Sequence, residues 1–237
     1  KARLIGSPDR FRGFYAVQTG NTCAQVIVRQ LLAAEGIIKT EEELFYRTME
    51  RGWYKNAHLC ADSRTPDKLC NVAYDPSSGN CYFYSNDRSN MLGSPGKAIC
   101  ERARRDGFTS YEGIPLLLRE FSRDAYSSKQ YSAAPNMSVS AARKARFDEL
   151  RRARKEVVQA LRDGKAVGIT VRAGVLWGTQ DAELHIIVMT AAVENPDGSI
   201  AGYYINDSGN SDYSRFVPAR LLEKAWAADD VHRIYRQ

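Results

Sequence analysis

The sequence predicts an α+β protein, with helices in the first part of the chain and an antiparallel sheet in the second. Three observations lead to this prediction. Apolar residues recur at helical spacing in several segments before residue 163, the apolar period changes to that of strands after it, and a strong turn signal joins two of those strands. We expect residues 1–237 to form a single domain that carries a cysteine-rich insert at about residues 52–100.

The first two helices are predicted from apolar spacing and capping residues. After an irregular lead-in with short extended pieces over residues 1–17, residues 22–35 form an amphipathic helix. Thr22 or the residue before it can cap this helix, and a glycine at position 36 can end it. Residues 41–51 are predicted to form a second helix, which Thr40 caps.

Two further helices are predicted before the strands begin. A short helix is expected at 116–121, a polar loop at 126–136, and a long helix at 139–162 that Gly164 ends. The apolar stripe of the long helix consists of Ala142, Phe147, Leu150, Val157, Val158 and Leu161.

The strands follow directly. Residues 167–172 form one strand, and residues 184–193 form another that is apolar on both faces and therefore central. The Asn-Pro-Asp-Gly sequence at 195–198 is a strong turn signal, and residues 200–206 form the returning strand.

Composition and charge exclude several classes of protein. The apolar runs are too short to cross a bilayer, so we expect no membrane span. The net charge of +6 owes much to residues 141–155, which hold seven basic and two acidic residues and which we interpret as a solvated helix face. No zinc-finger, RNA-binding or phosphate-binding motif accompanies them, so we expect no nucleic-acid partner. Because the chain begins with Lys1, we expect it to be a piece of a longer protein.

The five cysteines divide into one and four. Cys23 stands apart, whereas Cys60, Cys70, Cys81 and Cys100 lie within a segment rich in Asn, Asp, Ser, Pro and Gly. Their spacing contains no Cys-x-x-Cys pair, so we predict no metal and no cofactor. Disulfides could hold such a turn-rich segment together, or the four could be ordinary thiols, and the pairing stays open.

The predicted hairpin brings His185 next to polar residues. If the turn is centred on its Pro-Asp pair, the numbers of cross-strand partners sum to about 393, and Ser208 lies opposite His185. Asn206 and Asp207 lie beside that position, and a shift of one residue would put Asp207 directly opposite. The strand register therefore decides whether Asn206 or Asp207 orients the histidine ring.

Cys23 has the setting of an activated nucleophile. It falls in the first turn of the first predicted helix, where unpaired N–H groups and the positive end of the helix dipole lower the pKa of a thiol. A thiolate beside a histidine that a third group orients can attack a carbonyl carbon. The side-chain amide of Gln18 and the backbone N–H of Cys23 can donate to the resulting oxyanion. The alternative for Cys23 is a small core residue.

Three stretches of the sequence together resemble the papain-like cysteine peptidases, and most closely the C39-like group. They are residues 18–23 (QTGNTC), 184–188 (LHIIV) and 204–209 (YINDSG), and the segment 164–169 is also similar to that group. The matching regions cover about a third of the chain. Ala24 departs from the pattern, because most relatives have Gly or Trp after the cysteine, and this affects the expected fit of the substrate.

The resemblance implies a papain-like fold, in which a helical half carrying the cysteine packs on an antiparallel sheet carrying the histidine and the aspartate. It implies Cys23, His185 and Asp207 as catalytic residues and Gln18 as an oxyanion donor, with Asn206 as the alternative orienting residue. The implied activity is cleavage of a protein or peptide substrate by a cysteine protease without a metal or another cofactor.

C39-like domains also occur in bacterial polymorphic toxins and secreted effectors. By analogy, we expect a toxin or effector domain that is secreted or delivered by a bacterial secretion system, with a cognate immunity or inhibitor protein as a partner. The same Cys-His-Asp site could instead catalyse acyl transfer, deamidation or transglutamination, since all these reactions pass through a thioester. A non-enzymatic basic binding module is the remaining alternative.

Overall fold

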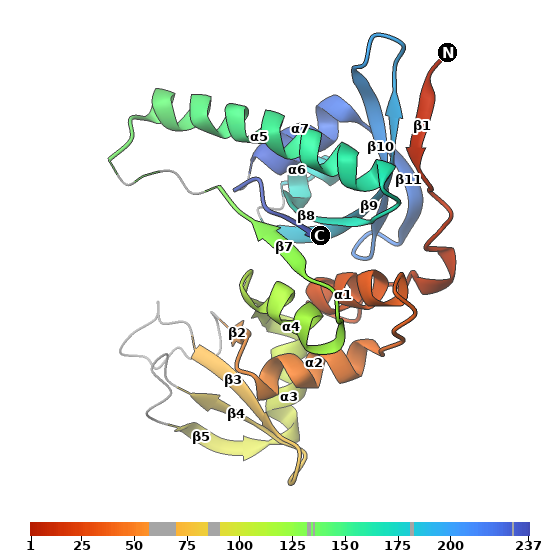
Figure 1. Cartoon of the computed structure of the whole chain (residues 1–237). Coiled ribbons are helices and arrows are strands. Elements are labelled where there is room, and N and C mark those ends of the chain that lie inside the picture. The colour runs from red at the N-terminus through yellow and green to blue at the C-terminus, as the bar shows by residue number, and fades with distance from the viewer. Residues whose placement is uncertain (57–69, 85–90, 132–133, 135, 181–182, 229) are drawn as a thin grey trace. The chain divides into compact units, whose positions relative to one another are not determined.

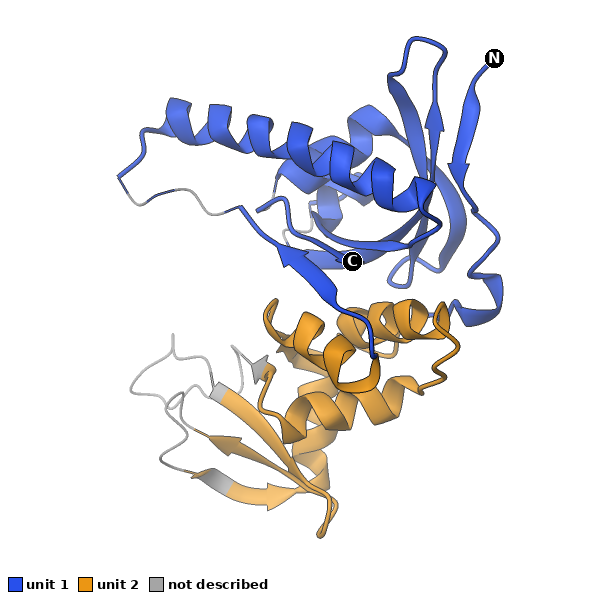
Figure 2. Cartoon of the chain, viewed as in Figure 1, with its two compact units in different colours: residues 1–17, 123–237 blue, residues 18–122 orange. Residues whose placement is uncertain are grey.

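The computed structural model describes residues 1–56, 70–84, 91–131, 134, 136–180, 183–228 and 230–237. They form two compact units, shown in different colours in Figure 2. Unit 1 combines Lys1–Val17 with Arg123–Gln237, and unit 2 consists of Gln18–Ser122. The chain therefore begins and ends in unit 1, and unit 2 is built from one continuous segment (Figure 1).

Unit 1 contains an antiparallel sheet with strand order β11-β10-β9-β8-β12-β7, and β1 also pairs with β9. The central strand β9 uses residues 184–189 to pair with β8 and residues 191–194 to pair with β1, so these two strands follow each other along one of its edges. The elements of unit 1 are β1 (Arg3–Gly6), the 3-10 helix η1 (Arg12–Phe14), β7 (Tyr126–Lys129), α5 (Val139–Arg162), β8 (Val167–Arg172), α6 (Ala173–Trp177), β9 (Leu184–Glu194), β10 (Ile200–Asp207), β11 (Asp212–Pro218), α7 (Ala219–Ala227) and β12 (Arg233–Arg236).

Helices α5 and α7 cover this sheet, and their side chains form the core with those of the strands (Figure 1). Their buried side chains pack with those of β8, β9 and β10, and they include Leu150, Val157, Leu161, Leu222 and Trp226. Burial of each such side chain contributes about 1.5–3 kcal/mol, so the helices fix the sheet from which the histidine and aspartate project.

The long helix α5 has the predicted bounds, but its predicted apolar stripe is only partly buried. Ser138 caps its start by accepting a hydrogen bond from the N–H of Ala141, and Gly164 follows its end with a φ of 73°. Its buried residues begin at Leu150, whereas Phe147 is 50% exposed. The prediction for Phe147 was therefore wrong, because helical period alone does not say how far a helix extends beyond the sheet that it covers.

The described residues of unit 2 form four helices and a second antiparallel sheet, with strand order β5-β4-β3-β2-β6. The predicted first two helices are present, and Thr40 forms the expected cap of α2 as part of a capping box with Glu43. The elements of unit 2 are α1 (Cys23–Ala33), α2 (Glu41–Glu50), β2 (Tyr54–Asn56), β3 (Cys70–Asp75), β4 (Asn80–Tyr84), β5 (Met91–Gly96), α3 (Lys97–Asp106), β6 (Phe108–Thr109) and α4 (Gly113–Phe121).

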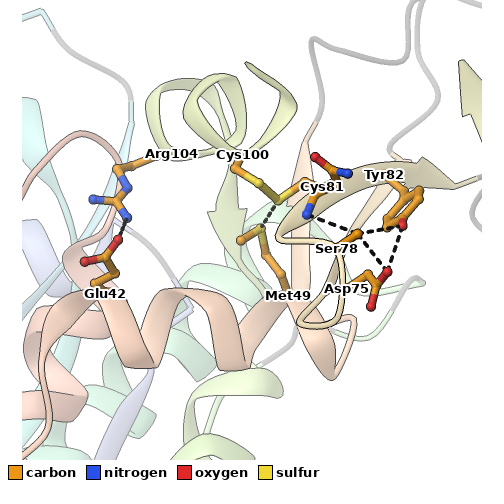
Figure 3. The surroundings of a disulfide bond; sticks show 9 residues. Glu42, Met49, Asp75, Ser78, Cys81, Tyr82, Cys100 and Arg104 are labelled. Atoms are coloured by element: carbon orange, nitrogen blue, oxygen red, sulfur yellow. Dashed lines mark hydrogen bonds and ion pairs between the residues drawn. A yellow bond between two sulfur atoms is a disulfide. The ribbon is translucent and has the colours of Figure 1, made fainter. Parts of the chain in front are cut away.

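The described part of the cysteine-rich insert is not the turn-rich loop that the sequence suggested. Its polar Asp-Pro-Ser-Ser-Gly-Asn run is the turn of the hairpin formed by β3 and β4, with Gly79 at a φ of 69°. Cys81 of β4 and Cys100 of α3 form a disulfide (Figure 3). Cys60 lies outside the described residues and Cys70 begins β3, so a second disulfide stays a prediction.

Two other outcomes concern segments whose structure depends on distant partners, and a third concerns membrane spans. Residues 126–129, expected to be loop, form the edge strand β7 against β12. No elements were predicted from the sequence for residues 208–237, where the structure has β11, α7 and β12. In the described residues, no helix combines the length and the hydropathy needed to cross a membrane.

Candidate active site

His185 and Asp207 form a buried hydrogen-bonded pair at one end of the sheet of unit 1. His185 Nε2 lies 2.7 Å from Asp207 Oδ1, and the two side chains are 5% and 0% exposed. His185 shares a face of β9 with Ile187 and Met189, whose side chains belong to the core. The same packing that buries the core therefore fixes the direction of the histidine ring.

The turn between β9 and β10 has one more residue than the predicted turn, which was centred on two residues. Asn195 N–H donates to the carbonyl of Ser199 at 2.8 Å, and Gly198 N–H donates to the carbonyl of Asn195 at 2.9 Å. Three residues thus lie between the paired ends, and Gly198 has a φ of 83°, as in a three-residue hairpin loop that ends in a left-handed glycine. The predicted register, centred on the Pro-Asp pair, was wrong by one residue.

This extra residue puts Asp207 of β10 on the same face of the sheet as His185 of β9. Asn206 pairs with Val188, and the two register shifts in the ladder, at 200/202 and at 204/205, cancel each other. Because successive side chains of a strand point to opposite faces, a change of one residue in the turn moves Asp207, and not Asn206, to the face of His185. Asn206 Oδ1 instead accepts a hydrogen bond from the N–H of Ser214 at 3.0 Å.

Asp207 is held as an anion by the donors around it. Trp177 Nε1 donates to its Oδ2 at 2.7 Å, and Gly209 N–H donates to its Oδ1 at 3.0 Å. Burial acts to raise the pKa of Asp207, but the hydrogen bonds and charge of His185, with the bonds from Trp177 and Gly209, lower it below its usual value. A carboxylate that is ionised at neutral pH can stabilise the imidazolium that forms when His185 takes a proton.

The sequence alone did not indicate the other residues of this cluster. The Trp177 ring lies 5.2 Å from that of His185, and a Cβ on Gly209 would lie 3.0 Å from His185 Cε1. Tyr15 donates to the main-chain carbonyl of Asp207 at 3.1 Å, and burial with the charges of Asp207 and Asp212 raises its pKa to about 12. Only the Asn-Asp-Ser-Gly run pointed to a glycine near the histidine, and nothing local to Trp177 or Tyr15 indicated a role.

Cys23 is the first residue of α1 in unit 2. It is a reduced cysteine of intermediate exposure, and the N-cap residue Thr22 makes no side-chain capping bond to the helix. Burial and then the charge of Cys23 raise the pKa of the buried Tyr54. The helix start that the sequence predicted around Cys23 is therefore confirmed, whereas its role as a nucleophile stays a prediction.

Gln18 lies in the loop before α1, in the same unit as Cys23. Its side-chain Nε2 donates to the carbonyl of Gly20 at 2.8 Å. Its role as an oxyanion donor stays a prediction. His185 and Asp207 lie in unit 1, and the structure gives the geometry of each half of the predicted site within its own unit.

Comparison with known proteins identifies the fold. No protein-family model and no curated protein matches the sequence. The structure is similar to a crystal structure of a "putative C39-like peptidase" from Bacillus anthracis, with a TM-score of 0.52 and 12% sequence identity over 99% of this chain and 98% of that chain. The chain has the fold of a C39-like peptidase.

Within this C39-like fold, the histidine–aspartate pair has the chemistry of a general base with an orienting partner. The bond between Nε2 of His185 and Asp207 fixes the direction of the imidazole ring. The described residues contain no group of three or more His, Cys, Asp or Glu side chains that could hold a metal ion.

Proposed function

We propose that this chain is a cysteine peptidase, in which Cys23 is the nucleophile and His185 is the general base. Asp207 orients the ring of His185 and stabilises its imidazolium form. The observation that carries the proposal is the buried His185–Asp207 hydrogen bond of 2.7 Å on the sheet of a C39-like fold. The start of α1 at Cys23 supports it, because the first turn of a helix favours a thiolate.

In the proposed reaction, the Cys23 thiolate attacks the carbonyl carbon of a peptide bond. The oxyanion that forms receives hydrogen bonds from the backbone N–H of Cys23 and from Gln18. His185 then gives its proton to the amide nitrogen, the C–N bond breaks, and a thioester remains on Cys23. Water attacks the thioester and gives its proton to His185, and the C–S bond breaks to release a carboxylic acid and restore the thiolate.

The test uses the Cys23→Ala variant of the full chain. We expect cleavage of unfolded casein to fall by about 10³-fold or more, since removal of a nucleophile leaves only binding and oxyanion stabilisation. Circular dichroism should be unchanged, because Cys23 is only partly buried and alanine is readily accommodated at the start of a helix. A folded variant with wild-type activity would exclude Cys23 as the nucleophile, and mass spectrometry of the products separates cleavage from deamidation or acyl transfer.

We also propose that the enzyme acts outside the cell that makes it, as a secreted toxin or effector. The Cys81–Cys100 disulfide supports this, because such bonds persist in oxidising compartments and are rare in reducing ones. In that setting the substrate is a protein of another cell, and the producing cell needs an immunity protein. Toxicity of the wild-type chain, and not of Cys23→Ala, when each is expressed in the target cell is the expected result.

A further inference from the structure

A single carboxylate oxygen holds the loop that leads to Cys23. Oε1 of Glu41, the first residue of α2, accepts hydrogen bonds from the backbone N–H and the hydroxyl of Thr19 and from the hydroxyl of Thr22. Thr19 and Thr22 lie on the loop and at the N-cap of α1, immediately before Cys23. Glu41 therefore fixes both ends of the short segment that enters the helix.

The bond to Glu41 changes what the N-cap residue does. A threonine at an N-cap usually accepts a hydrogen bond from an N–H of the first helical turn. The Thr22 hydroxyl instead lies against Glu41 Oε1 and, at 3.0 Å, the carbonyl of Thr19, and it makes no bond to α1. The N–H groups of the first turn are thus not capped by Thr22, and they are the groups that can stabilise a thiolate or an oxyanion.

The other side of the loop is fixed by the end of α3. The N–H of Asn21 donates to the carbonyl of Arg104 at 2.8 Å. Gly20 has a φ of 72°, and a Cβ at this position would lie 2.6 Å from the same carbonyl. With the loop closed on this side, the carboxylate of Glu41 determines the direction of the Thr22 hydroxyl.

We propose that Glu41 is a positioning residue for Cys23, because it holds the hydroxyl of Thr22 away from the first turn of α1 and leaves the N–H groups of that turn to the thiolate and the oxyanion. The inference rests on the proposed function, in which Cys23 is the nucleophile. It assigns to Glu41 a role in reactivity beyond the stability of α2.

Glu43 offers a matched control in the same helix turn. Its carboxylate completes the capping box of α2 by accepting bonds from the backbone N–H and the hydroxyl of Thr40. Those bonds stabilise the start of α2, and the hydrogen-bond partners found for its carboxylate do not lie in the loop of residues 19–22. Glu43→Ala therefore removes a carboxylate of α2 and tests stability alone.

The experiment measures alkylation of Cys23 by iodoacetamide at pH 6, where an ordinary thiol with a pKa of about 8.5 reacts slowly. Peptide mapping by mass spectrometry assigns the label to Cys23. Glu41→Ala removes the acceptor, Glu41→Asp keeps the charge but shortens the reach, and Glu41→Gln keeps an acceptor oxygen without the charge. We expect Ala and Asp to slow labelling by about five- to tenfold, the size of a typical N-cap interaction, and Gln to stay within about twofold of wild type.

Two further variants show whether the hydroxyl of Thr22 carries the effect. Thr22→Val cannot cap the helix, so in the Glu41→Ala background it should restore labelling to near the wild-type rate. Glu43→Ala should lower the melting temperature and leave the labelling rate unchanged. Circular dichroism verifies folding, and Glu41→Asp carries the test if the alanine variant does not fold.

The possible failures are distinct. Wild-type labelling at the rate of an ordinary thiol would overturn the proposed function and the inference with it. Fast wild-type labelling that is equally fast in folded Glu41→Asp would overturn the inference about Glu41 alone. Faster labelling in both Glu41→Ala and Glu41→Gln would show that the charge of Glu41 opposes the thiolate, which also contradicts a positioning role.

Discussion

Asp207 uses one carboxylate to connect three parts of unit 1. Its Oδ2 accepts from Trp177, at the end of α6, and its Oδ1 accepts from His185 on β9 and from the N–H groups of Gly209 and Asn210 in the following turn. A buried carboxylate with this many donors is costly to replace, because each donor left without an acceptor costs about 1–3 kcal/mol. Stability and the proposed chemistry therefore depend on the same side chain.

The roles of Asp207 and Asn206 can be separated by mutation. Asp207→Ala should lower turnover at least about tenfold, because the histidine loses its orienting and charged partner. Asn206→Ala should lower the melting temperature, because its Oδ1 accepts from Ser214, which has a φ of 51°. Its turnover per folded molecule should stay near that of wild type. Loss of turnover in Asn206→Ala with full activity in Asp207→Ala would reverse the assignment.

Trp177 offers a test of the electrostatics of the pair. Trp177→Phe removes the N–H that donates to Asp207 and keeps an aromatic ring beside His185. The folded-state pKa of Asp207 lies below its usual value. The stabilisation from this group is therefore present above its unfolded-state pKa of about 4, and it is lost as the pH falls through the folded-state pKa.

The difference in unfolding free energy between wild type and Trp177→Phe should therefore be largest near neutral pH and should shrink below about pH 4. Urea denaturation at a series of pH values measures it. A difference that is the same at pH 7 and pH 3 would indicate that Trp177 acts by packing alone.

At the scale of elements, α3 connects the cysteine-rich segment with the loop before Cys23. The Cys81–Cys100 disulfide joins it to β4, and Arg104, near its end, stacks its guanidinium 4.6 Å from the ring of Phe45 in α2. Arg104 Nη2 also lies 3.9 Å from Glu42 Oε1 in an ion pair, and Figure 3 draws this pair together with the disulfide. The carbonyl of Arg104 then holds the N–H of Asn21, so the insert supports the start of α1.

Removal of this disulfide should destabilise unit 2. A crosslink between residues 19 apart in sequence is worth about 3 kcal/mol in the chain-entropy account. We expect the double variant Cys81→Ala, Cys100→Ala to lose stability of this order in urea denaturation, with Cys23→Ala as a control that loses little. A double variant as stable as wild type would mean that the buried cluster around Tyr54 and Phe45 holds α3 without the bond.

At the scale of the whole molecule, the first residues of the chain belong to the same unit as its C-terminal part. Strand β1 pairs with β9 in a ladder that runs from the pair Arg3 and Glu194 to the pair Gly6 and Ala191. Ile5 of this strand is buried in the core of unit 1. The exposed Arg3 of the Arg3–Glu194 ion pair adds little, so the pairing and the burial of Ile5 carry the stabilisation. The N-terminal residues therefore support the strand that carries His185.

Deletion of residues 1–6 should loosen β9 near its C-terminal end. Loss of the buried Ile5 side chain alone corresponds to about 1.5–3 kcal/mol, so amide exchange in residues 191–194 should accelerate by about 10- to 100-fold. Hydrogen-exchange mass spectrometry measures this, with peptides of α2 as the internal reference. Unchanged protection of residues 191–194 would show that β10 holds this part of the strand without β1.

Much of the secondary structure followed from local sequence signals. The bounds of α5 and β8 and the Thr40 cap of α2 were predicted because apolar period, caps and terminal glycines act within a few residues of each other. The helix start at Cys23 belongs to the same class. The sheet of the insert, β7 and the elements after residue 207 were not predicted, because short strands are stabilised by partners far along the chain.

The candidate site divides in the same way. The sequence alone determined that His185 lies on a strand near Asn206 and Asp207, and that Cys23 opens a helix. Only the tertiary structure decided that Asp207 is the partner of His185, because one additional residue in the turn moves every later side chain of β10 to the other face. It also decided the hydrogen-bond partners of Trp177 and Glu41, since hydrogen bonds between elements arise from packing that no local pattern encodes.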